Sequence, residues 1–122
     1  MSNFRFFPLL LALSIMLAGS SCLRDLRDSI DCAAEFISVS LHHVTDMEDP
    51  KEVSFDLTYS GSYRVDDQIT WDFGDGQSQT RTGLTATHTY ASSGNYTVTA
   101  TVTLRNDDAS CTSELTELVR VQ

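Results

Sequence analysis

One short segment, Trp-Asp-Phe-Gly-Asp-Gly at 71–76, restricts the fold more than any other part of this sequence. Trp71 and Phe73 are two positions apart, so both side chains project from the same face of a strand. The Gly-Asp-Gly run at 74–76 ends that strand with residues that accept a positive φ angle, as a tight hairpin turn requires. The segment therefore predicts a strand followed by a sharp turn, which is typical of antiparallel β proteins.

Strict alternation of apolar and polar residues predicts a long strand over 95–105. Shorter alternating runs predict a first strand at 37–41, a second at 53–59 and a third at 69–73. Strands at 77–82, 85–90 and 115–121 complete a set of about seven. Turn signals separate the strands, with an acidic turn at 43–51 and a loop at 60–67. Seven short strands with frequent turns predict an all-β antiparallel sandwich.

The alternation also predicts which side chains form the core. Each inward-facing position lies two residues from the next, and the outward-facing threonines of 97–103 suit a solvated strand face. The predicted core is Ile37, Val39, Phe55, Leu57, Ile69, Trp71, Phe73, Tyr96, Val98, Ala100, Val102 and Val119.

Two further segments follow the Trp71 strand in a fixed order: His-Thr-Tyr at 88–90 and Gly-Asn-Tyr-Thr-Val at 94–98. Tyr96 opens a strand just after a glycine, the position of a tyrosine corner in immunoglobulin-like sandwiches. The ordered set resembles the PKD (polycystic kidney disease) domain, whose pattern is W-x-F-G-D-G, then H-x-Y, then G-x-Y-x-V. This resemblance covers residues 32–122 and implies an immunoglobulin-like β-sandwich that binds or spaces rather than catalyses. The residues that carry it are Trp71, Phe73, Gly74, Asp75, Gly76, His88, Tyr90, Gly94, Tyr96 and Val98.

The N-terminus has the features of an export signal. Arg5 precedes an apolar run of about 14 residues, which is shorter than the roughly 20 that a membrane-spanning helix needs, so we predict a signal peptide at 1–21. The segment 17–22 resembles a bacterial lipobox, with Gly19 where a lipobox usually carries leucine. We predict that Cys22 is lipidated; the alternative is ordinary cleavage that leaves a thiol. Leu23 is not an acidic inner-membrane retention residue, which favours the outer membrane.

Net charge limits the classes of partner. The chain carries a formal charge of −9, and loss of residues 1–21 removes one arginine and no acid. Such a chain lacks the basic face that nucleic acid requires, and charge alone would not hold it on an anionic lipid surface. We therefore expect membrane contact only through the lipid anchor, with residues 22–31 as a charged tether to a domain at 32–122. The charged stretch 23–31 could form a helical turn, but nine residues rarely hold a helix alone.

The cysteine count agrees with export. Once Cys22 is assigned to a lipid, Cys32 and Cys111 remain as a pair. The first and last strands lie side by side in an immunoglobulin-like sandwich, so the resemblance implies a disulfide between Cys32, before the first strand, and Cys111, between the last two. It differs from the antibody inter-sheet bond, because Val98 occupies that position.

At three residues, a role in sugar binding or catalysis is an alternative to a structural role. Trp71 would suit a sugar-stacking platform, but a tryptophan on the third strand is typical of a sandwich core. Asp75 would suit a catalytic carboxylate, but it stands in a turn between two glycines. No serine or cysteine is placed by the sequence to be activated by His88, which resembles the packing histidine of the family's H-x-Y pair. We therefore predict that the protein is not an enzyme.

Metal binding has one candidate region. His42 and His43 lie near several acids, but adjacent strand residues point to opposite faces, which argues against zinc. Loop carboxylates suit calcium better, so calcium stays as the alternative to our prediction of no cofactor. Those carboxylates are Asp46, Glu48, Asp49, Asp66, Asp67, Asp107 and Asp108.

The loop at 60–67 is the candidate recognition site. It combines Tyr63, Arg64, Asp66 and Asp67 on a connection between strands, and tyrosine and arginine are enriched at binding hot spots. The alternative is an ordinary polar loop with Tyr63 folded onto the core. We expect the partner to be an envelope or extracellular protein; a polysaccharide is the alternative, for which Tyr59, Tyr63 and Tyr90 are the only candidate stacking residues.

Overall fold

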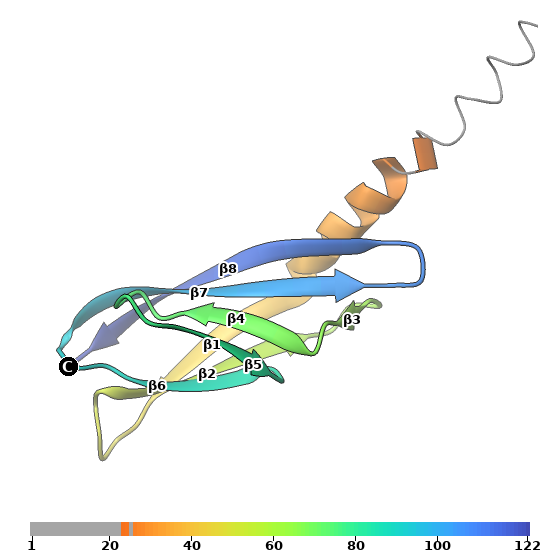
Figure 1. Ribbon diagram of the computed structural model, residues 1–122. Coiled ribbons are helices and arrows are strands. Elements are labelled where there is room, and N and C mark those ends of the chain that lie inside the picture. The colour runs from red at the N-terminus through yellow and green to blue at the C-terminus, as the bar shows by residue number, and fades with distance from the viewer. Residues whose placement is uncertain (1–22, 25) are drawn as a thin grey trace, which may run out of the picture.

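The computed structural model describes residues 23–24 and 26–122, so the predicted signal peptide and Cys22 lie outside the described residues. Two antiparallel sheets pack face to face, as predicted, and a helix projects from one end of the sandwich (Figure 1). One sheet has the strand order β1-β2-β6. The other has the order β3-β7-β4-β5, and β8 also pairs with β7 along the full length of that strand.

The strands match the seven predicted ones, with one addition. Their bounds are β1 Val39–Thr45, β2 Glu52–Tyr59, β3 Arg64–Val65, β4 Gln68–Asp72, β5 Ser78–Thr82, β6 Thr85–Thr89, β7 Gly94–Arg105 and β8 Ser110–Val121. The added strand, β3, lies in the predicted loop at 60–67 and pairs with the end of β7. β8 begins five residues before the predicted 115, because all of its twelve residues pair with β7. Cys111 therefore lies within the last strand rather than before it.

The core fills the space between the sheets with the alternating side chains of six strands. Trp71 is fully buried and packs against Phe55, with ring centroids 5.9 Å apart. Its indole N–H has no hydrogen-bond acceptor in the described part of the chain, so packing holds this ring. Burial on this scale, at about 25 cal/mol per Å² of apolar surface, is the main stabilising contribution to the fold.

Two predicted core residues are placed differently. Ile37 is 88% exposed, because Phe36–Ser38 form a 3₁₀ turn (η1) and strand alternation begins only at Val39. Tyr96 is half-buried at the end of β7. Buried residues that the predicted core omitted are Cys32, Leu41, Val53, Ala86, His88, Tyr90, Leu104 and Val121.

The segment before the domain is helical, where the sequence favoured a tether. Residues 23–24 and 26–35 have helical conformation, and this helix continues past the charged stretch into residues that are fastened to the sandwich. Isolated short helices are marginal in water, so these fastenings supply what the local sequence lacks. No helix among the described residues has the length and apolar character needed to cross a membrane.

Candidate functional site

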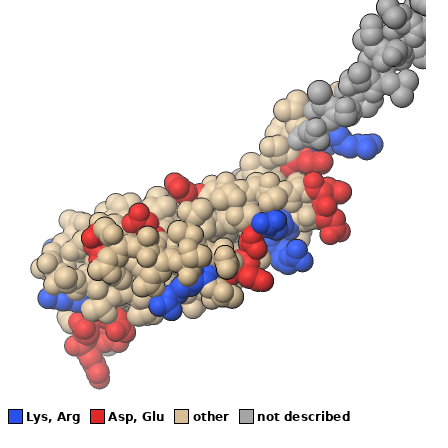
Figure 2. Space-filling model, in the orientation of Figure 1, with Lys and Arg blue, Asp and Glu red and all other residues tan. Residues whose placement is uncertain are grey.

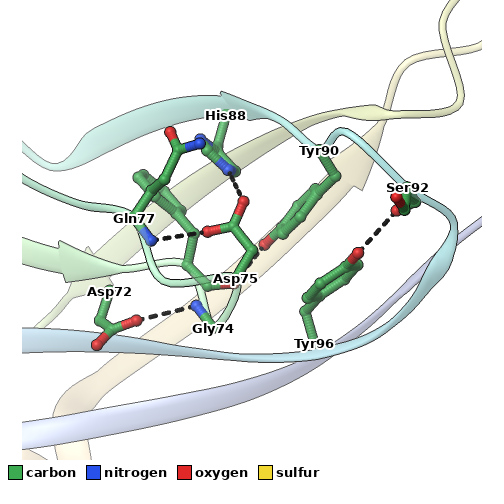
Figure 3. A network of polar contacts seen from close by, with 9 residues as sticks. Asp72, Gly74, Asp75, Gln77, His88, Tyr90, Ser92 and Tyr96 are labelled. Carbon is green, nitrogen blue, oxygen red and sulfur yellow. Dashed lines mark hydrogen bonds and ion pairs between the residues drawn. The ribbon is translucent and has the colours of Figure 1, made fainter.

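Residues of the three motif segments, at 71–76, 88–90 and 94–98, gather around the hairpin between β4 and β5 (Figure 3). This hairpin lies at the end of the sandwich away from the helix, which we call the motif end (Figure 1). Phe73 N–H donates to the Gln77 carbonyl (3.0 Å) and closes the turn. Gly74 has φ 77°, and a Cβ atom there would collide with the backbone of Thr97 on β7. Glycine is required at this position both for its backbone angle and for the close approach of β7.

Asp75 and His88 form a close pair across this turn. Nε2 of His88 lies 2.6 Å from Oδ2 of Asp75, and Oδ1 of the same carboxylate accepts the Gln77 N–H at 3.0 Å (Figure 3). Burial raises the pKa of Asp75, but the hydrogen bonds from His88 and Gln77 and the charge of His88 outweigh it. The net pKa of Asp75 is therefore lowered.

Four rings connect this pair to the core and to the tyrosine corner. The His88 ring stacks on Phe73 at 4.1 Å and meets the edge of Tyr90, which stacks on Tyr96 at 4.2 Å. Tyr90 Oη donates to the Phe73 carbonyl (2.9 Å), and Tyr96 Oη donates to the Ser92 carbonyl (2.8 Å), as in a tyrosine corner. Burial, with the charge of Asp75 as a smaller cause, raises the pKa of Tyr90 far above its usual value. Tyr90 therefore stays a neutral donor.

A carboxylate–imidazole pair is also part of many hydrolytic sites. Here the pair holds the β4–β5 turn against β6. His88 is only 5% exposed, and stacking holds its ring between Phe73 and Tyr90. Within residues 26–122, the one side-chain hydrogen bond that this ring makes is to the carboxylate of Asp75. Asp75 is hydrogen-bonded within the turn and to His88, and Trp71 is a core residue. The ring of Trp71 is therefore not available to a sugar.

The opposite end of the sandwich carries the candidate recognition loop, which Glu35 of the helix fastens. Tyr59 Oη donates to Oε2 of Glu35 (2.7 Å), and Ser62 donates to Glu35 through both its hydroxyl and its N–H. Tyr59 Oη in turn accepts the Tyr63 N–H at 2.7 Å. Hydrogen bonds from Ser62 and Tyr59 lower the pKa of Glu35, so it stays ionised at neutral pH. The sequence reasoning missed Glu35, since no local pattern links it to residues 24 to 27 positions away.

The four predicted loop residues have different environments. Tyr63 is half-buried against the core, as the alternative had it. Asp66 accepts two hydrogen bonds from Arg105, at 3.1 and 2.9 Å to the same oxygen. Asp67 is exposed, and its carbonyl accepts the Gly83 N–H. Arg64 is exposed and lies opposite Arg105 in the β3–β7 pair.

A hollow of about 220 Å³ lies beside this pair of arginines, lined by Ser62, Arg64, Arg105, Asn106 and Asp107. Figure 2 shows basic and acidic side chains next to one another at the end of the sandwich nearest the helix. Asp66 balances the charge of Arg105, whereas Arg64 has no carboxylate within ion-pair distance in the described part of the chain. Like charges directly opposite one another in a sheet are destabilising, so Arg64 is placed at a cost to the free domain.

The histidines and acids considered for metal binding are dispersed. His43 Nδ1 pairs with Glu117 Oε1 at 3.0 Å, joining β1 to β8, while His42 is exposed. Asp46 accepts the N–H groups of Glu48 and Asp49 and thereby shapes its own turn. In residues 23–24 and 26–122, no three His, Cys, Asp or Glu side chains are grouped as metal ligands.

The last fastening of this end is covalent. Cys32 of the helix and Cys111 of β8 form a disulfide, with their Cα atoms 6.0 Å apart and a sequence separation of 79. Cys32 is fully buried. The predicted pairing is therefore confirmed, although the bond reaches β8 from a helix.

Comparison with known proteins agrees with this architecture. The family model of the PKD domain matches residues 39–119, most of the chain. This chain belongs to the PKD domain family. Among solved structures, the chain matches the PKD1 domain of Vibrio anguillarum Epp, at 24% identity and a TM-score of 0.47, covering 70% of this chain and 96% of that one. Comparison with curated proteins gives no match.

Membership explains which residues form the motif end. PKD domains are generally non-catalytic and often mediate protein interactions or adhesion. The matched range contains the whole Asp75–His88 network and the recognition loop, but it begins after Cys32 and Glu35. The helix and both of its anchoring residues are thus additions to the part of this chain that the PKD model matches.

Proposed function

We propose that this protein is a non-catalytic, cofactor-free lipoprotein of the bacterial envelope whose PKD domain binds another protein. The observation that carries the proposal is Arg64, an exposed cation opposite Arg105 on the rim of a polar hollow. A partner that presents a carboxylate to this hollow would neutralise Arg64 and relieve the like-charge contact, giving a charge-assisted hydrogen bond.

The tyrosines support a protein partner over a polysaccharide. A sugar-binding face needs aromatic rings open to solvent, and Tyr90 is buried while Tyr59 and Tyr63 are half-buried. The hydroxyl groups of Tyr59 and Tyr90 are already hydrogen-bonded within the domain. A polysaccharide therefore remains an outcome of the test rather than a second proposal.

Anchoring at Cys22 would also determine where the partner lies. The helix leaves the sandwich at the same end as β3 and the turn between β7 and β8 (Figure 1). An anchor just before Leu23 would turn the Arg64 hollow toward the membrane and the Asp75–His88 end away from it. We therefore propose a partner that is itself embedded in, or held close to, the same membrane.

Cross-linking in intact cells tests the proposal. A photo-reactive amino acid at Asp107 should capture one dominant protein, and Arg64→Glu should abolish that product. The matched control is Arg120→Glu, because Arg120 is an exposed strand arginine near the opposite end of β8. Equal loss in both variants, or no reproducible protein product, would contradict the proposal and send the domain to a polysaccharide panel.

Lipidation has a separate test. Mass spectrometry of the protein extracted from membranes should show an acylated N-terminal cysteine, and Cys22→Ser should release the chain into the soluble fraction. An unmodified Cys22 would contradict the anchor without touching the Arg64 site.

A further inference from the structure

The N-terminal helix carries an unpartnered apolar stripe. Leu23, Leu26 and Ile30 follow the three- and four-residue spacing that places side chains on one face of a helix. All three are between 61% and 69% exposed, and Ile37 continues the series just past the helix. Ala33 is exposed between them. Half of the large apolar side chains that the described residues expose lie in this short segment.

The stripe faces away from the sandwich. At 3.6 residues per turn, Cys32 lies half a turn round the helix from Leu23. Cys32 is buried and disulfide-bonded, and Glu35, on the same side as Cys32, is hydrogen-bonded to Tyr59 and Ser62. The domain therefore fixes one face of the helix and turns the apolar face outward.

Two occupants for this face can be compared. Pairing with a second copy as a coiled coil needs three or four heptads of apolar positions, whereas this stripe spans about two. A lipid surface needs an amphipathic helix with one apolar face, long cationic side chains at its flank and a starting point at the membrane. Arg24 and Arg27 are exposed, and the described part of the helix begins at Leu23, the residue that follows the predicted anchor cysteine.

We propose that this helix lies on the membrane surface, with Leu23, Leu26 and Ile30 among the acyl chains and the sandwich on the aqueous side. The inference rests on the proposed anchoring at Cys22. Arg24 and Arg27 reach the headgroups with their charged tips while their stems cover apolar surface. Three acids in the described helix, Asp28, Asp31 and Glu35, outnumber these cations. Apolar insertion rather than charge therefore drives the contact, and neutral phosphatidylcholine is a suitable surface.

Tryptophan quenching tests this placement in the protein as cells produce it. The natural Trp71 is fully buried and supplies a constant background. Ile30→Trp puts a reporter in the stripe, and Ser29→Trp puts a matched one beside it, about 100° round the helix. The protein is extracted from membranes and reconstituted in phosphatidylcholine vesicles with and without brominated acyl chains. We expect a blue shift and loss of the added emission for Ile30→Trp and neither for Ser29→Trp.

Three outcomes overturn the inference in distinguishable ways. Protein that floats with the vesicles, but whose Ile30→Trp emission is neither blue-shifted nor quenched, leaves the anchor intact and removes the helix contact. An Ile30→Trp emission that is blue-shifted but unquenched, together with cross-linked dimers, makes a second copy the occupant. Protein that fails to float with vesicles overturns the anchor and, with it, this inference. Circular dichroism confirms that each variant is folded.

Discussion

The two ends of this sandwich are fastened by different means. At the end away from the helix, the hydrogen-bonded Asp75–His88 pair and stacked rings join Phe73, Asp75, His88 and Tyr90, which lie within a short stretch of sequence. At the helix end, a disulfide joins Cys32 to Cys111 at a sequence separation of 79, and Glu35 accepts a hydrogen bond from Ser62 of the loop at 60–67. The first end belongs to the PKD motif, and the second depends on residues before the matched range. The two ends therefore differ in whether all of the residues that stabilise them lie inside the range that the PKD model matches.

The largest effect should come from the covalent fastening. Replacing both Cys32 and Cys111 with serine removes a constraint on the unfolded chain, for which the entropy model gives about 4.5 kcal/mol at this separation. Urea unfolding of the double serine variant and of the parent protein measures this loss in the free energy of unfolding. Cys22→Ser is the control and should leave the midpoint unchanged. An unchanged midpoint in the double variant would mean that the helix end contributes little to global stability.

His88→Ala should have the next largest effect, because it empties a buried ring site and leaves Asp75 without its partner. We expect a loss of about 3 kcal/mol in the free energy of unfolding, as for other emptied aromatic sites. His42→Ala is a matched control at an exposed histidine. If the two variants unfold at the same urea concentration, the Asp75–His88 contact does not stabilise the fold.

Two glycines in the β4–β5 turn allow two causes of lost stability to be distinguished: a strained backbone angle and a steric clash with another strand. Gly74 and Gly76 both have positive φ, but only a side chain at Gly74 would strike another strand. Gly76→Ala should cost roughly 1–2 kcal/mol, the usual strain of a left-handed residue, and Gly74→Ala distinctly more. Thermal unfolding of the two variants side by side measures the difference. Equal melting temperatures would mean that the close contact between Gly74 and β7 does not add to the cost of the substitution.

These residues also show what the sequence could and could not predict. Alternation in 95–105 and the glycines at 74–76 are local patterns, so the strands, the turn and most of the core followed from them. Contacts between distant positions left no such pattern. Nothing near Glu35 indicates Ser62, and nothing near Asp75 indicates a hydrogen bond to His88, although both residues were noted as motif members. The helix was missed because its stability comes from Cys32 and Glu35 rather than from its own sequence.

Acid should weaken the motif end through Asp75. Its pKa is lowered in the folded state, so its contribution is complete above the unfolded value of about 4 and is lost as the pH falls through the folded one. Urea unfolding at neutral pH and at about pH 3 should therefore show a smaller acid-induced loss in Asp75→Asn than in the parent. Glu35 and Asp46 also have lowered pKa values, so the parent curve contains their contributions as well. Identical losses in the two proteins would show that the Asp75–His88 pair does not couple to folding.

The smallest effect should come from Glu35→Gln, since this carboxylate is at the surface. We expect global unfolding to change little, while the amides of Ser62 and Tyr63 exchange with solvent faster because the acceptors that order them are weakened. Hydrogen exchange measured by NMR resolves the two amides, with Thr87 on β6 as an internal reference. Unchanged exchange at Ser62 and Tyr63 would mean that the loop is ordered without the helix.

The disulfide also determines how the domain would bear a mechanical load. A pull applied between the N-terminus and the C-terminus enters the domain at Cys32 and passes through the Cys32–Cys111 bond directly into β8. The chain between these cysteines, which includes seven of the eight strands, is shielded from extension as long as the bond is intact. Only the part of β8 beyond Cys111 can be peeled from β7. In an oxidising compartment the domain is therefore a short, stiff link, and reduction would turn it into a long extensible one.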